Sequence, residues 1–82
     1  MDEYQEAVKE FFKVYNGMKK IYLLSLAINF KGDEETKYSI NITRQQGKEI
    51  KTIIRVKESS DTEAFRRAKA ELLRYYKVNT GG

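Results

Sequence analysis

The stretch "TKYSINITRQQGKEIKTIIRVK", residues 36–57, decides the fold. In its first half apolar side chains alternate with small polar ones, and β-branched residues dominate its second half. This period of two is typical of β-strands that bury one face. Between the halves, "QQGK" supplies the glycine of a tight turn, so we expect an antiparallel hairpin. The alternation assigns these residues to its apolar face: Tyr38, Ile40, Ile42, Ile50, Thr52, Ile54 and Val56. It assigns these to the other face: Lys37, Ser39, Asn41, Thr43, Lys51, Ile53 and Arg55.

A third strand is expected at residues 20–30, "KIYLLSLAINF", joined to the hairpin by the loop "KGDEET". Its apolar face would carry Tyr22, Leu24, Leu26, Ile28 and Phe30, which we interpret as core residues rather than as a platform for stacking bases. Its other face would carry Ile21, Leu23 and Ala27. Because each connection is short, the three strands should form an antiparallel meander.

Helices are expected on either side of the strands. Residues 3–16 carry apolar side chains at helical spacing, and Asn16-Gly17 provides a stop signal. Ser60 and Glu63 have the spacing of a capping box at the start of a second helix, whose apolar face contains Phe65, Ala68, Leu72 and Tyr76. The fold class is therefore α+β in the order αβββα, with both helices packed on one face of the sheet.

This order of elements resembles the topology of the double-stranded-RNA-binding domain over nearly the whole chain. The resemblance implies the fold only. That family opens its second helix with a pair of lysines, whereas this chain has Asp61, Thr62 and Glu63 there, and the first hairpin loop is acidic instead of carrying a Gly-Pro-x-His-like motif. No residue roles are carried over from it.

Length and composition favour one non-enzymatic domain. The 82 residues suit a single domain at 1–78, followed by a flexible tail at 79–82. Histidine and cysteine are absent, which removes the commonest catalytic base and the thiol nucleophile. We expect no cofactor and no small-molecule substrate, and we interpret Asp33-Glu34-Glu35 as a solvated turn rather than a metal site. The longest apolar run is too short to span a membrane, and a cytoplasmic location is the default expectation.

Charge points to an anionic partner. Residues 17–57 carry nine basic and four acidic side chains, and the whole chain has a net charge of +4. On the second helix a basic row could grip phosphates, helped by two residues of the last strand. This hypothesis assigns nucleic-acid or nucleoprotein binding to Arg66, Arg67, Arg74, Lys77, Lys51 and Arg55. The alternative is a solvated helix face whose arginines pair with Glu63 and Glu71.

A second hypothesis of another class uses the uncovered face of the sheet. Its expected mixture of apolar and small polar groups suits a protein partner or a homodimer. The residues assigned to this interface are Ile21, Leu23, Ser39, Asn41 and Ile53. The alternative is that the ends of the chain cover them. By analogy of size and composition, such a protein could be a phage or mobile-element inhibitor of a host enzyme, as anti-CRISPR proteins are.

Overall fold

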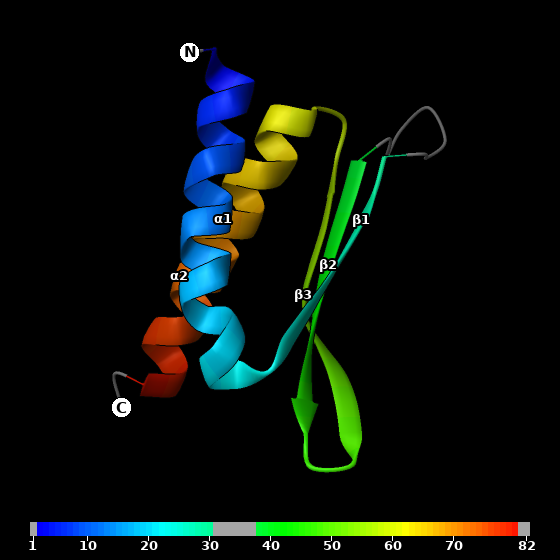
Figure 1. Ribbon diagram of the computed structural model, residues 1–82. Helices are drawn as coiled ribbons and strands as arrows, with labels where there is room; N and C mark the ends of the chain where they lie inside the picture. The colour runs from blue at the N-terminus through cyan, green and yellow to red at the C-terminus, as the bar shows by residue number, and fades with distance from the viewer. Residues whose placement is uncertain (1, 31–37, 81–82) are drawn as a thin grey trace.

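A computed structural model describes residues 2–30 and 38–80 and confirms the α+β fold, with a layer of two helices on one side of a three-stranded sheet (Figure 1). The elements are α1 (Glu3–Tyr22), β1 (Leu24–Asn29), β2 (Tyr38–Gln46), β3 (Glu49–Glu58) and α2 (Asp61–Thr80). The strands lie in the order β1-β2-β3, and both neighbouring pairs are antiparallel. Residues 79 and 80, which we expected in the tail, belong to α2.

The first helix is longer than the sequence predicted. It begins at a cap in which the Asp2 carboxylate accepts a hydrogen bond from the Gln5 backbone N–H at 2.7 Å. It then continues through Gly17, because the buried stripe of Phe11 and Tyr15 extends to Met18 and Tyr22. Packing of this stripe outweighs the helix-breaking tendency of one glycine, which costs only about 1 kcal/mol.

The end of α1 is marked by backbone geometry instead of by glycine. Leu23 adopts the left-handed conformation with φ 54°, and its N–H bonds to the Lys19 carbonyl. Glycine usually occupies this position because it has no Cβ to clash. The first strand therefore starts at Leu24, and the expected strand at residues 20–30 is wrong over its first four positions.

A β-bulge in β3 corrects the expected faces of this strand. Ile42 pairs with Ile54, but the next residue, Thr43, pairs with Thr52, so Ile53 is an extra residue. A one-residue shift sends every following side chain to the opposite face. Thr52 and Ile50 consequently lie on the uncovered side of the sheet, and Lys51 lies on the helix side.

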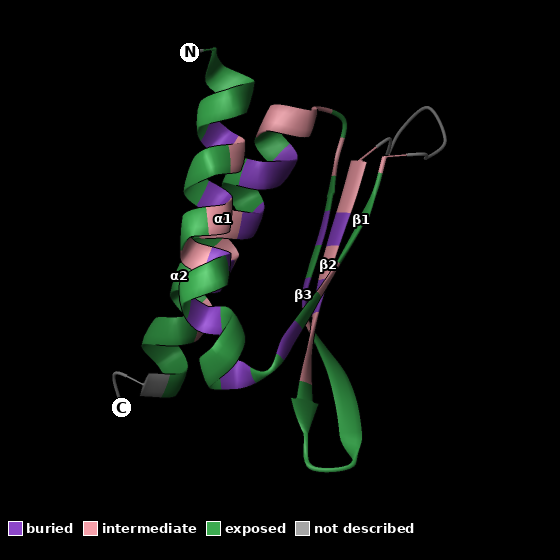
Figure 2. Ribbon diagram, viewed as in Figure 1, coloured by how far each residue is buried: buried purple, intermediate pink, exposed green. Residues whose placement is uncertain are grey.

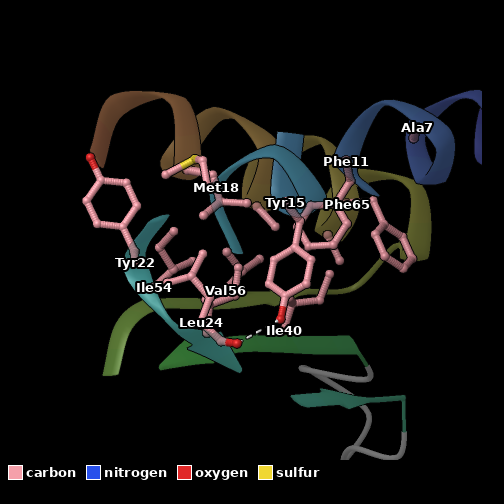
Figure 3. Close-up of a cluster of buried hydrophobic side chains, with 14 residues drawn as sticks. Ala7, Phe11, Tyr15, Met18, Tyr22, Leu24, Ile40, Ile54, Val56 and Phe65 are labelled. Atoms are coloured by element: carbon pink, nitrogen blue, oxygen red, sulfur yellow. Dashed lines mark hydrogen bonds between the residues drawn. The ribbon is translucent and has the colours of Figure 1, made fainter. Parts of the chain in front are cut away.

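The core lies between the helices and β2–β3 (Figure 2). Its fully buried large side chains are Phe11, Ile40, Ile42, Val56 and Leu72. Figure 3 shows the helix and strand side chains of this core meeting in one cluster. Tyr22 is buried, and Phe30 and Tyr38 pack against the core, as the sequence predicted.

The second helix starts at the expected cap, with Ser60 Oγ accepting a hydrogen bond from the Glu63 N–H at 3.4 Å. It runs in the same direction as α1 and crosses behind it in Figure 1. Near their starts Tyr4 contacts Phe65, and near their ends Tyr22 contacts Tyr75.

Candidate nucleic-acid interface

The basic row of α2, formed by Arg66, Arg67, Arg74 and Lys77, does not form one surface. Its first two arginines turn toward different neighbouring elements. Arg66 turns toward α1, with Nη1 at 3.1 Å from Glu63 Oε1 and Nη2 at 3.9 Å from Glu3 Oε2. Arg67 turns toward β3, where its Nη1 lies 2.6 Å from Glu58 Oε2. The first two arginines of the row are therefore on different sides of the helix, and carboxylates of the chain compensate both.

The positive charges in the second half of the row are not paired with carboxylates of the described chain. Arg74 and Lys77 are exposed and form no ion pair within residues 2–30 and 38–80. Arg74 lines a groove of about 280 Å³ between α2 and β3. The remaining lining residues are Ile53, Glu71, Tyr75, Val78 and Asn79. Arg74 thus brings positive charge to the β3 side of the helix layer.

The uncovered face of the sheet carries a second group of cations. Arg55 and Lys57 are two residues apart in β3, so they share a face, and the register places Asn41 and Ser39 opposite them. The other described side chains on this face belong to Ser25, Ala27, Asn29, Thr43, Gln45, Ile50 and Thr52. None of the described side chains on this face is acidic, so the formal charge that they carry is purely positive.

Lys51 is separated from Arg55 by the bulge. On the helix side of the sheet it pairs across the strands with Arg44, and its Nζ lies 3.9 Å from Glu49 Oε2. Both partners of this ion pair are exposed, and such pairs contribute little to stability. The expectation that Lys51 and Arg55 act from the same face is therefore wrong.

The expected protein interface does not form one surface. Ser39 and Asn41 lie on the uncovered face of the sheet, as the alternation predicted. Ile21 lies in the last turn of α1 and Leu23 at its end, whereas Ile53 faces α2 in the groove beside Arg74. The expectation that all five share a sheet face is wrong, because the longer helix and the bulge relocate the three apolar residues.

Sequence reasoning missed Arg44, the most enclosed cation in this region. Its guanidinium lies 4.7 Å from the centre of the Tyr22 ring and 6.0 Å from that of Tyr75, and Nη1 donates to the Tyr75 hydroxyl at 2.7 Å. Its Nε and the Tyr22 hydroxyl are buried without a hydrogen-bond partner in the described part of the chain. An arginine at the end of a strand gives no sequence signal for such a contact, since its aromatic partners come from both helices.

An apolar groove of about 390 Å³ runs along the outer seam of the helix pair. Its lining residues are Lys13, Val14, Gly17, Met18, Ile21, Leu73 and Tyr76. Ile21 is 64% exposed and Leu73 is 46% exposed. Toward the start of α1 the seam is closed by the ion pair between Lys69 Nζ and Glu10 Oε2, at 3.2 Å. The apolar groove therefore lies along the second halves of the two helices.

No group of three acidic side chains in residues 2–30 and 38–80 could hold a metal ion, and the Asp33–Glu35 turn lies outside the described residues. Burial raises the pKa of the Tyr15 phenol above its usual 10.0, and its hydroxyl donates to the Leu24 carbonyl at 3.4 Å. Neither helix, over the residues described, is long and apolar enough to cross a membrane.

No protein-family model, curated protein or solved structure matches the chain.

Proposed function

We propose that the protein is a non-enzymatic binding protein that docks on nucleic acid, alone or within a nucleoprotein, through the β3 side of its sheet. The observation that carries this proposal is the charge of the uncovered face, whose described side chains include no acid and where Arg55 and Lys57 lie beside small polar groups. An arginine can grip one phosphate through two N–H groups. Asn41 and Ser39, across from the two cations, add neutral groups that can hydrogen-bond phosphate or sugar oxygens.

Arg74 extends the proposed surface around the edge of β3 to the helix layer. Lys77 and Lys51 are further contributors at its margins. Arg66 and Arg67 contribute less, because a phosphate must compete with the carboxylates that already hold them. Such exposed ion pairs are weak, so their arginines stay accessible to a stronger anion.

The composition of the face favours backbone contacts over base reading. No described aromatic side chain lies on it, so it lacks the stacking platform that single-strand binders use. We expect modest affinity with little sequence preference. Three phosphate contacts correspond to a slope of roughly −2.7 in log K against log salt for duplex DNA, which is about a fortyfold loss between 50 and 200 mM salt.

Fluorescence anisotropy with labelled duplex DNA, duplex RNA and single strands at these two salt concentrations tests the proposal. The double variant Arg55→Glu/Lys57→Glu should remove binding to any of these nucleic acids. Arg66→Gln is the matched control, because it removes a charge that is already paired, and it should change affinity less than threefold. If the wild-type protein binds none of the probes at 50 mM salt, the nucleic-acid function is excluded.

The apolar seam of the helix pair favours a second candidate function, that of a protein-interaction module or inhibitor. Lys13 lines this groove, and Lys20 and Lys77 lie beside its apolar residues in sequence. A basic border around an apolar groove suits an amphipathic partner helix with acidic flanks. The open sheet face that the sequence favoured for this role keeps only Ser39 and Asn41 of the expected interface.

Gly17 offers a clean test of this second candidate. A Cβ built at Gly17 meets no atom within 4 Å, so a larger side chain fits the fold and projects into the groove. Gly17→Glu, which adds both bulk and a charge that repels the peptide, should weaken binding of a glutamate-flanked, leucine-faced helical peptide at least tenfold, whereas Gly17→Ala should not. Equal peptide binding by both variants would exclude the seam as the docking site.

A further inference from the structure

Strand β1 forms an edge of the sheet with unused backbone groups. The Leu23 carbonyl accepts a hydrogen bond from the Gln45 N–H at 3.2 Å, which fixes the alternation of bonded positions along the ladder. From this alternation, the N–H and C=O groups of Leu24, Leu26 and Ile28 point away from β2. The Tyr15 hydroxyl reaches the Leu24 carbonyl, and no other described group bonds to these outward-pointing atoms.

This edge also lacks the features by which proteins protect a strand from pairing. The six residues of β1, "LSLAIN", contain no charge and no proline, and their pairing with β2 has no bulge. Charges, prolines and bulges are the usual protective devices at sheet edges. Within β1 itself, no charge, proline or bulge therefore opposes the addition of another strand.

The apolar side chains next to this edge are incompletely covered. Ile28 points to the helix side of the sheet but is 41% exposed, because the helices sit mainly over β2 and β3. At the other end of β1 a groove of about 450 Å³ separates the strand from α1. It is lined by Phe12, Tyr15, Asn16, Lys19, Leu24, Ser25 and Leu26. An exposed isoleucine and a groove of mixed polar and apolar lining thus lie at opposite ends of one strand.

We infer that β1 pairs with β1 of a second copy of this chain, antiparallel and centred on Leu26. Only a two-fold axis at Leu26 matches all the outward-pointing groups, because it sets Leu26 opposite itself and Leu24 opposite Ile28 of the second copy. It also brings Ile28 of the second copy to the groove beside Leu24 of the first. By symmetry, Ile28 of the first copy reaches the same groove of the second. The strand is neutral, so self-pairing opposes no like charges.

The resulting dimer has one continuous six-stranded sheet. Both helix pairs lie on one face of it, and the uncovered faces of the two copies join on the other, with Arg55 and Lys57 near its two ends. This inference does not depend on nucleic-acid binding, because it uses another edge of the sheet. One pair of six-residue strands buries less than the roughly 1,200 Å² of a standard interface, so we expect a dimer with a dissociation constant in the micromolar range.

Sedimentation equilibrium of the full chain, from about 1 μM to 500 μM to span the expected range, tests the inference. Ile28→Pro removes an outward N–H and leaves the ladder with β2 intact, so it should raise the dissociation constant at least tenfold. If the proline variant does not fold, Ile28→Lys replaces it in the test. This variant keeps the N–H but adds a charge at the edge, and it should also raise the dissociation constant at least tenfold. Ile28→Val is the matched control and should dimerise within threefold of wild type.

Disulfide cross-linking tests the register. The chain has no cysteine, so Ser25→Cys and Ala27→Cys introduce the only thiols. Centring on Leu26 makes position 25 face position 27 of the second copy, so the double variant should oxidise to a covalent dimer far faster than either single variant. A wild-type protein that is monomeric at all concentrations, a dimer that survives both Ile28→Pro and Ile28→Lys, or equal cross-linking by the single variants would overturn the inference.

Discussion

The two edges of the sheet differ in almost every property that controls association. Strand β3 has a bulge at Ile53 and carries Lys51, Arg55 and Lys57, whereas β1 is short, regular and uncharged. The bulge and the lysines discourage strand pairing at β3, and the same cations attract anions. The difference teaches that one sheet can present two kinds of surface, one suited to anions and one suited to another strand.

Deletion of Ile53 should have the largest effect on the difference between the two edges, because it removes the bulge from β3. It would remove the bulge and the Ile53 side chain while keeping the pairing of Thr52 with Thr43 and of Lys51 with Arg44, so Ile50 and Thr52 would stay on the uncovered face. Loss of the Ile53 contacts with α2 should cost about 2–4 kcal/mol, as for truncation of a large aliphatic core residue. Urea denaturation measures this change, and a loss below about 1 kcal/mol would mean that the contacts of Ile53 with α2 contribute little to stability.

Arg44→Met tests how firmly the region beyond the bulge is held to the helices. The change removes the hydrogen bond to Tyr75 and the contacts with the two tyrosine rings, but it also removes a buried Nε without a partner. We expect a net loss of about 1 kcal/mol in the free energy of unfolding. Tyr75→Phe, which deletes the hydroxyl alone, is the comparison variant. A methionine variant as stable as wild type would show that the unpaired Nε cancels the favourable contacts.

Leu23→Gly should raise the free energy of unfolding, because it relieves backbone strain in the connection between α1 and β1. Leu23 has a positive φ and a side chain that is 59% exposed, so glycine relieves strain while losing little burial. The gain should be roughly 1 kcal/mol, reduced by the greater freedom of glycine in the unfolded chain. Thermal unfolding followed by circular dichroism measures it. A lower midpoint in the glycine variant would show that the exposed leucine side chain contributes more than the strain costs.

Tyr15→Phe should have the smallest effect at neutral pH, about 0.5 kcal/mol, since its bond to the β1 backbone is long. Burial raises the pKa of the folded Tyr15 phenol, so the folded protein keeps this proton to a higher pH than the unfolded chain does. The free energy of unfolding of the wild type should therefore fall as pH rises past 10, and that of the phenylalanine variant should fall less steeply. Urea midpoints measured between pH 8 and 11 compare the two, and parallel curves would contradict the assignment.

The sequence predicted the elements that follow from a single repeating pattern. Alternation around Ile40 and Ile42 identifies β2, and the Ser60 cap identifies the start of α2. It failed where two signals compete, as at Gly17, where a buried stripe carries the helix through a local stop signal. The adjacent pair Ile53-Ile54 interrupts the alternation of β3 and, in retrospect, is the sequence signal of the bulge.

The candidate site was less predictable than the fold, because its residues meet through tertiary contacts. Arg66 and Arg67 are neighbours in sequence, yet they pair with carboxylates on different elements, Glu3 of α1 and Glu58 of β3. Glu3 and Glu58 are 63 and 9 residues away in sequence, beyond the reach of a helical-spacing argument, which predicts only the pair of Arg66 with Glu63. Arg55 and Lys57, in contrast, follow from strand alternation alone, although the sequence analysis named only Arg55.

An odd number of strands between two helices has an electrical consequence. The chain returns in its original direction, so both helix dipoles point the same way and add instead of cancelling. Acidic side chains sit in the first turns, at Glu3, Glu6, Asp61 and Glu63, and basic ones in the last turns, at Lys19, Lys20 and Lys77. These charges balance each dipole and leave a molecule that is acidic at one pole and basic at the other. In the field of a polyanion the C-terminal ends of the helices are therefore attracted first, and Arg55 and Lys57, which lie nearer the helix starts, make contact in a second step.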